Sequence, residues 1–260
     1  MIPKKIHYCW FGGNPLPELA QKCIASWKKY CPDYEIIEWN ESNFDLNCCA
    51  YVKEAYEAKK WAFVSDVARL YALVNYGGIY MDTDVEVIRP IDDLLQYEAV
   101  SGFEAKDRIQ TGLMACREGQ LLFVELLHDY DRAHFVKEDG TYDTTTNVTR
   151  ITNTCLKYGL QLNNTLQTIK GFTLLPYDYL CPKNSSTKVL TITKNTLVIH
   201  HFDGSWLPEV DRLAAQLQSK YNRLLPGRLA RLLAKFVAVK RMNGLGTAVK
   251  ETTRWIKKVK

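Results

Sequence analysis

The chain of 260 residues has no uninterrupted apolar run near the roughly 18 residues that a membrane-spanning helix requires. It also lacks the phosphate-binding patterns G-x-x-x-x-G-K-[ST] and G-x-G-x-x-G. Its eight cysteines include no C-x-x-C pair, so the spacing typical of thiolate metal sites is missing. These absences argue against a membrane-spanning segment, a P-loop nucleotide enzyme and a thiolate metal protein.

The cysteines are even in number, which would permit disulfides. No signal peptide precedes Ile2-Pro3-Lys4-Lys5, which is typical of the start of a folded domain. We therefore expect reduced, mostly buried thiols in a cytoplasmic protein, with peripheral contact to the inner face of the cell membrane left open.

Charge is unevenly distributed along the chain. Segment 212–260 holds 13 Lys and Arg against one acid, Glu251, which gives +12. The remaining residues hold 21 basic and 28 acidic side chains, which gives −7 and accounts for the net charge of +5. A strongly basic tail on a mildly acidic body indicates a polyanionic partner, and we favour a membrane surface over nucleic acid.

Local patterns predict an α/β fold. An apolar run at 5–10 indicates a strand, the spacing of apolar residues over 18–30 indicates a helix, and residues 34–39 indicate a second strand. Strand, helix and strand in this order favour a parallel pair. A further helix over 63–75 ends at Gly77-Gly78, and a strand at 79–81 follows.

The C-terminal part differs in character. From Leu207 onward the pattern is helical and basic, with breaks at Pro226-Gly227 and at Gly244. We therefore predict a catalytic domain over 1–207 and a basic amphipathic helical appendage over 208–260.

The strand at 79–81 leads directly into Asp82-Thr83-Asp84. Two carboxylates separated by one residue at a strand end can face one hard cation, and oxygen ligands suit Mg²⁺ or Mn²⁺. Remaining coordination positions can take a diphosphate, and the cation then stabilises charge on that leaving group. Asp66 and Arg69 lie one helical turn apart on the preceding helix, where they form either a wall of the same cleft or a surface ion pair.

Three segments together resemble a known family. Ser65-Asp66-Val67-Ala68-Arg69, followed by Gly77-Gly78-Ile79-Tyr80-Met81-Asp82-Thr83-Asp84, is similar to the D-x-D sugar-binding region of the Och1-like glycosyltransferases of family 32. This family shares its core with the clostridial glucosylating toxins. Residues 6–12 resemble its opening strand, and residues 200–206 (H-H-F-D-G-S-W) resemble its closing motif. The resemblance covers about residues 1–207.

The resemblance implies a GT-A type fold with a mostly parallel sheet, and a nucleotide sugar bound where open α/β sheets generally bind ligands. It implies transfer with retention of anomeric configuration. We expect a nucleotide-diphosphate donor, with UDP favoured, that carries a hexose or an N-acetylhexosamine. The expected acceptor is a saccharide or lipid-linked saccharide of capsular or surface polysaccharide synthesis.

The same resemblance implies roles for particular residues. Trp10 matches a residue that stacks on the nucleotide base, with core packing as the alternative. Asp66 and Arg69 match catalytic-centre residues that grip the donor sugar and its diphosphate. Asp82 matches the carboxylate near the ribose and the metal, and Asp84 the direct metal ligand.

The closing motif adds further candidates. Ser205 and Trp206 match a loop that closes over the diphosphate, and Trp206 has core packing as its alternative. A late histidine can complete a Mn²⁺ site in related retaining enzymes. Of His200 and His201 we favour His201, because it stands nearer the Gly-Ser-Trp loop.

A catalytic role is also expected for Gln110. The family commonly carries Asn before Gly in this region, and here the run is Gln110-Thr111-Gly112. An amide beneath the sugar would stabilise an oxocarbenium-like state. Double displacement would need a carboxylate nucleophile that the sequence does not identify, so we favour front-face attack with the leaving phosphate as base, as the family implies.

Two other function classes were weighed. A nucleotidyltransferase typically has a glycine-rich phosphate loop, which is absent. A non-catalytic nucleotide-sugar or carbohydrate-binding protein of the same fold stays open. For the tail, interleaved apolar and basic residues over 223–260 fit either an anionic membrane interface or a helical cap packed on the domain.

Overall fold

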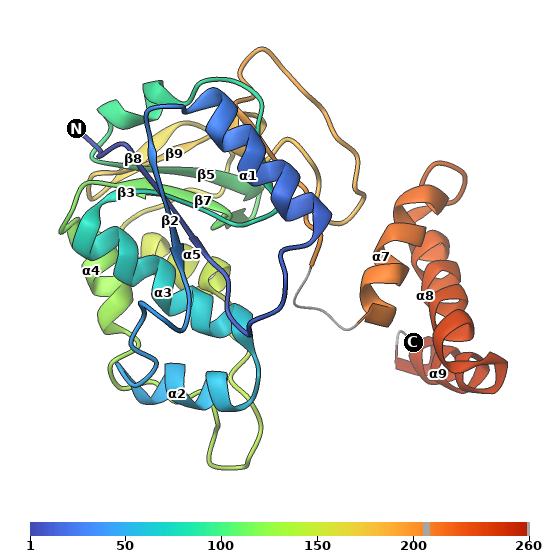
Figure 1. The fold of residues 1–260 in the computed structure, drawn as a ribbon. Coiled ribbons are helices and arrows are strands. Elements are labelled where there is room, and N and C mark those ends of the chain that lie inside the picture. The colour runs from blue at the N-terminus through green and yellow to red at the C-terminus, as the bar shows by residue number, and fades with distance from the viewer. Residues whose placement is uncertain (205–208, 259–260) are drawn as a thin grey trace. The chain divides into compact units, whose positions relative to one another are not determined.

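The computed structural model describes residues 1–204 and 209–258 (Figure 1). The chain divides into two compact units. The first comprises residues 1–183 and 191–201, and the second comprises residues 184–190 and 202–260. Each unit has a hydrophobic core of its own. The predicted domain division at residue 207 stays a prediction.

The first unit alternates strands and helices along the chain. Its N-terminal elements are β1 (Lys5–Cys9), α1 (Glu18–Tyr30), β2 (Glu35–Trp39), α2 (Ala50–Glu57), α3 (Trp61–Tyr76), β3 (Gly78–Met81) and β4 (Val85–Val87). The elements that follow are η1 (Asp92–Gln96), β5 (Ala99–Ala105), β6 (Arg108–Ile109), β7 (Leu113–Cys116), α4 (Leu121–His128), α5 (Asn147–Lys157), β8 (Gln167–Ile169), β9 (Phe172–Leu175), α6 (Tyr177–Leu180) and β10 (Val198–His200).

The main sheet has the strand order β2-β1-β3-β7-β5-β9-β8, with β6 paired to β5. Pairs β1/β2, β1/β3 and β5/β9 are parallel. Strand β7 runs antiparallel to both β3 and β5, and β8 runs antiparallel to β9. Five of the seven described strands on this path therefore run in one direction, which confirms the predicted α/β fold with a mostly parallel sheet.

Side chains of the central strands alternate between two cores. In β3, Ile79 and Met81 belong to the core that includes Trp27 of α1. Tyr80 belongs to the opposite core, with residues of α3 and α4. This is the period of two expected for a strand buried on both faces. Helix α1 covers one face of the sheet and α3 with α4 the other (Figure 1).

The turn between α3 and β3 directs the chain into the D-x-D segment. Gly77 and Gly78 have φ values of 59° and 100°. A Cβ at Gly78 would lie 2.8 Å from the backbone oxygen of Lys5. Both conditions favour glycine, because L-residues rarely adopt such φ values and a side chain would meet β1. The abrupt turn places β3 directly beside β1.

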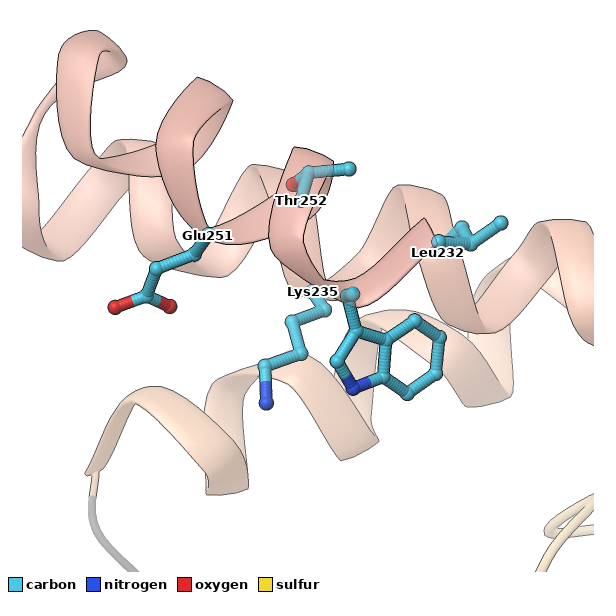
Figure 2. Close-up of a pocket in the computed structure, with 5 residues that line it drawn as sticks. Leu232, Lys235, Glu251 and Thr252 are labelled. Carbon is cyan, nitrogen blue, oxygen red and sulfur yellow. The ribbon is translucent and has the colours of Figure 1, made fainter. Parts of the chain in front are cut away.

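The second unit consists of α7 (Glu209–Tyr221), α8 (Gly227–Asn243) and α9 (Leu245–Lys258). Its core contains Leu217, Ala234 and Ala238, and alanines at these positions let α8 approach α7 closely. A small pocket between α8 and α9 is lined by Leu232, Lys235, Glu251, Thr252 and Trp255 (Figure 2). Among the described helices, none combines the length and apolar character needed to cross a bilayer.

Candidate functional site

The D-x-D segment forms a tight turn at the carboxyl end of β3. The Asp82 backbone N–H donates to the Gly112 carbonyl at 2.8 Å, and the Val85 N–H donates to the Asp82 carbonyl at 3.0 Å. The chain then enters β4. Because of this turn, the carboxylates of Asp82 and Asp84 lie at the same edge of the sheet, with side-chain exposures of 27% and 18%.

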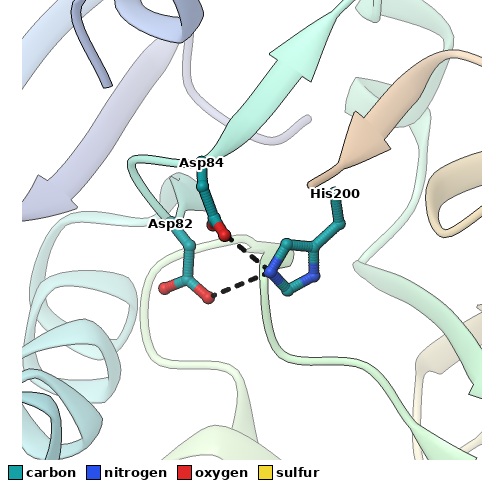
Figure 3. Close-up of side chains that lie close together, drawn as sticks. All are labelled: Asp82, Asp84 and His200. Atoms are coloured by element: carbon teal, nitrogen blue, oxygen red, sulfur yellow. Dashed lines mark ion pairs between the residues drawn. The ribbon is translucent and has the colours of Figure 1, made fainter. Parts of the chain in front are cut away.

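A third candidate metal ligand, an imidazole, comes from far along the chain. Strand β10 runs antiparallel to β4, and His200 is paired with Val85. His200 Nε2 lies 3.3 Å from Asp84 Oδ1 and 4.0 Å from Asp82 Oδ2 (Figure 3). One ligand atom from each residue lies within 4.8 Å of the others. Two carboxylates and one imidazole suit a divalent cation such as Mn²⁺, which accepts both oxygen and nitrogen ligands.

The environment of His200 reflects the two carboxylates. Burial lowers the pKa of His200, but the adjacent Asp84 more than offsets this, so the pKa lies well above its ordinary value. The neighbouring Cys181 thiol also acts to raise the pKa of His200.

We predicted His201 as the metal-ligating histidine, and the structure places its side chain elsewhere. His201 Nε2 lies 2.8 Å from Glu86 Oε2, and Glu86 also pairs with Lys22 at 3.0 Å. The His201 backbone N–H donates to the Asp84 carbonyl. The imidazole of His201 is thus engaged by Glu86, and it is His200 that stands beside the D-x-D carboxylates. The preference for His201 was based on its closeness in sequence to the Gly-Ser-Trp loop. Which of the two histidines faces Asp84 is decided instead by the pairing of β10 with β4.

Gln110 is placed differently from the expected position beneath a sugar. Its side chain is fully buried. The amide Nε2 donates to the Leu113 carbonyl at 2.6 Å and to Ser101 Oγ at 3.1 Å, while Oε1 accepts from the Leu113 N–H at 2.9 Å. These bonds engage both the nitrogen and the oxygen of the amide. The predicted catalytic role is therefore wrong, and Gln110 instead shapes the turn before β7.

That turn brings Gly112 against His200. A Cβ at Gly112 would lie 2.6 Å from His200 Nδ1. Because Gly112 also accepts the hydrogen bond from the Asp82 N–H, the same turn contacts two of the three candidate ligands. Gln110 and Gly112 therefore act together as positioning residues for this site.

Arg69 and Asp66 form a buried pair, which excludes the surface ion-pair alternative. They are 6% and 7% exposed. Arg69 Nη2 lies 3.3 Å from Asp66 Oδ1 and 3.3 Å from Asp82 Oδ1, and Nη1 donates to the Thr111 carbonyl at 2.9 Å. The guanidinium lies over the Tyr80 ring, 4.5 Å from its centroid. Arg69 thus links the helix α3 face to the D-x-D turn.

Asn147 completes this network and was missed by the sequence patterns. Its backbone N–H donates to Asp66 Oδ2 at 3.1 Å, and its Nδ2 donates to the Asp66 carbonyl at 2.7 Å. Its Oδ1 accepts from Tyr130 at 2.8 Å. Asn147 is the first residue of α5, so the carboxylate sits at a helix N-terminus, where negative charge is favoured. The Thr-rich run before it signals a helix start, but nothing local points to a partner 81 residues away.

The remaining candidates fall in two groups. Trp10 follows β1 and is half-buried against the core, with Nε1 donating to the Asn14 carbonyl. Because β1 and β3 are parallel, it stands at the same sheet edge as Asp82. Ser205 and Trp206 lie outside the described residues.

The fold is α/β with a largely parallel sheet, and the site combines an acidic turn at the carboxyl edge of that sheet with an imidazole beside it. Residues 17–101 match the family model described as "Glycosyltransferase sugar-binding region containing DXD motif". This match confirms the resemblance for residues 17–101, which are similar to the sugar-binding region of those glycosyltransferases.

Similar proteins are mannosyltransferases of yeasts. Inositol phosphoceramide mannosyltransferase 3 of Schizosaccharomyces pombe is 29% identical over 138 residues, which is 52% of this chain and 38% of the relative. Mannosyl phosphorylinositol ceramide synthase of Saccharomyces cerevisiae is 33% identical over 111 residues, 38% of this chain and 27% of the relative. The chain therefore matches well under half the length of these relatives.

Among solved structures, PaToxG glycosyltransferase superposes with a TM-score of 0.47 at 18% identity, over 60% of this chain and 69% of that chain.

Proposed function

We propose that the protein is a metal-dependent glycosyltransferase that moves a hexose or N-acetylhexosamine from a nucleotide-diphosphate sugar, with UDP favoured, to a saccharide acceptor. The observation that carries the proposal is that Asp82 and Asp84, in the turn after β3, lie together with His200 of β10. A family match that includes Asp82 and Asp84 supports the same reading.

Each residue has a distinct task in this proposal. Asp82, Asp84 and His200 would hold Mn²⁺ or Mg²⁺, which neutralises the leaving diphosphate. Arg69 holds Asp82 in place through its contact at 3.3 Å and adds a fixed positive charge. Asp66, oriented by Arg69 and Asn147, fixes the guanidinium in turn.

The proposed reaction retains anomeric configuration by front-face attack. The bond between the anomeric carbon and the diphosphate oxygen breaks, and a bond to the acceptor hydroxyl oxygen forms on the same face. The acceptor proton passes to the departing phosphate oxygen, so no protein nucleophile is required.

The acceptor is proposed to be a saccharide of surface polysaccharide synthesis or a lipid-linked saccharide. The names of the yeast relatives describe mannose transfer to inositol phosphoceramide, a lipid. This supports a hexose donor and a lipid-linked acceptor for this chain, and it makes GDP-mannose a necessary comparison with UDP-sugars.

The direct test measures nucleoside diphosphate release from a panel of UDP- and GDP-sugars, with Mn²⁺ or with chelator. We expect release that requires the metal, and Asp84→Asn should reduce it at least about a hundredfold while the protein stays folded. Asp93→Asn, which alters an exposed carboxylate, is the matched control and should keep full activity. Undiminished release by Asp84→Asn would exclude the mechanism. Donor binding without any release would favour the non-catalytic binding protein.

The two adjacent histidines supply an internal comparison in the same assay. His200→Ala should raise the Mn²⁺ concentration needed for half-maximal release at least about tenfold, because a ligand is lost. His201→Ala should change that concentration less, because its imidazole contacts Glu86. The reverse order would contradict the ligand assignment.

A further inference from the structure

We propose that residues 223–233, here called the Leu–Arg tip, dock the protein on an anionic lipid bilayer. The tip comprises the α7–α8 connection and the first turns of α8. Three leucines in it face solvent: Leu224 is 84% exposed, Leu229 is 54% exposed and Leu233 is 40% exposed. All three lie within ten residues of chain, and exposed apolar surface of this kind is typical of binding sites for a macromolecule or a membrane.

The orientation of α8 explains why the leucines are outside. Leu229 and Leu233 are four residues apart and therefore share one helix face. Ala230 and Ala234, one position further along, are buried at 0% and 1% exposure. The small alanines pack into the helical unit, and the larger leucines point away from it. The packing of α8 thus leaves Leu229 and Leu233 in solvent.

Positive charge is interleaved with these leucines. Arg223, Arg228 and Arg231 are exposed. No Asp or Glu occurs in the sequence between Asp211 and Glu251. Within the described part of the second unit, these arginines form no ion pair, whereas Lys235 pairs with Asp211 at 3.7 Å. The tip therefore presents uncompensated cationic charge together with apolar surface.

An anionic bilayer surface matches both properties at once. Leucines can enter the boundary between headgroups and acyl chains, while arginines contact lipid phosphates in the same plane. Nucleic acid would satisfy the arginines but leave the leucines in water, so we favour lipid. The inference rests on the proposed function in one respect, because a lipid-linked acceptor would be presented at such a surface.

The experiment is flotation of the full chain with vesicles of equimolar phosphatidylcholine and phosphatidylglycerol, compared with phosphatidylcholine alone. We expect binding to the anionic vesicles, weakened at least about tenfold by Leu224→Ser, Leu229→Ser and Leu233→Ser together. Replacing the three arginines of the tip by Gln should have a similar effect. Equal binding of the wild-type chain to both vesicle types would overturn the role of charge.

Matched controls come from the first unit. Leu121→Ser and Leu166→Ser remove leucines that are 76% and 60% exposed, and both variants should float like the wild type. The matched control for the arginine variant changes three exposed basic residues to Gln, and it should also float like the wild type. These residues are Lys53, Lys106 and Arg132. Equal losses in these controls, absence of vesicle binding, or binding of duplex RNA in place of vesicles would each overturn the proposal.

A second readout separates this proposal from the proposed function. Nucleoside diphosphate release is measured without vesicles, and the tip variants should retain the wild-type rate because the tip lies in the other compact unit. Vesicle binding with no release would contradict the enzymatic proposal alone. Release with no vesicle binding would contradict the docking proposal alone.

Discussion

Asp66 is a carboxylate enclosed by protein, and its surroundings oppose its charge more than they favour it. Burial raises the pKa of Asp66, Arg69 and the Asn147 N–H act in the other direction, and the result is about 6 against an ordinary 3.8. Between these values the folded state binds more protons than the unfolded state. The contribution of Asp66 to the unfolding free energy is therefore greatest below pH 4, falls as pH rises to 6, and is level above.

Asp66→Asn should remove this contribution. Over the interval from pH 4 to 6, the wild type should lose on the order of 3 kcal/mol relative to the variant. Denaturant unfolding of both proteins at several pH values measures the difference. Parallel curves for the two proteins would show that the carboxylate is not the source.

Asp143 provides a control of opposite sign. Burial raises its pKa, but the Thr145 hydrogen bonds and Arg150 outweigh this, so the pKa is lowered. Its carboxylate therefore contributes stability that is present above the ordinary pKa and is lost as pH falls through the lowered value. The Asp143 contribution to the free energy of unfolding increases with pH, and Asp143→Asn should remove it. The Asp66 contribution decreases with pH, and Asp66→Asn should remove that one.

Among the elements, the turn between β6 and β7 touches the site at two points, Asp82 and His200. Gly112→Ala would place a methyl group 2.6 Å from His200 Nδ1 if nothing moved. We expect His200 to shift and the apparent affinity for Mn²⁺ to fall about tenfold or more. Metal titration by thermal stabilisation measures this, with His200→Ala as the limiting case.

Gly246→Ala is the matched control for that substitution. No atom lies within 4 Å of a Cβ built at Gly246, which is in α9. Alanine there should leave the metal response unchanged and stabilise the helix by about 0.5–1 kcal/mol. An equal loss of metal affinity in both glycine variants would argue against the steric explanation.

The order of helices and strands could largely be predicted from local sequence. Which strands pair with one another could not. Helix α3, its glycine end and the strand before Asp82 follow from apolar spacing and turn chemistry, which act within a few residues. The insertion of β7 between β3 and β5 depends on pairing across the chain. Gln110 illustrates the consequence, because its hydrogen-bond partners Ser101 and Leu113 decide its role.

For the whole molecule, the uneven charge predicts salt-sensitive docking. Residues outside segment 212–260 carry a charge of −7, and the segment itself carries +12. The net charge of the whole chain is therefore much smaller than the positive charge of this segment. The Debye length shrinks from about 30 Å at 0.01 M salt to about 3 Å at 1 M. Binding to phosphatidylglycerol vesicles should weaken steeply across this range in the flotation assay. Insensitivity to salt would mean that the leucines act without the arginines.

The sequence by itself indicated the α/β fold, the likeness to a sugar-binding region and the two acidic candidate ligands, because the D-x-D signature is contiguous and lies at a strand end that local patterns reveal. Only the tertiary structure decided which histidine joins them, that Asn147 orients Asp66, and that Gln110 serves a turn. Those assignments depend on which side chains meet after β10 pairs with β4 and the first residue of α5 bonds to Asp66 of α3. Such encounters are set by strand register and packing between residues far apart in the chain, and no local pattern encodes them.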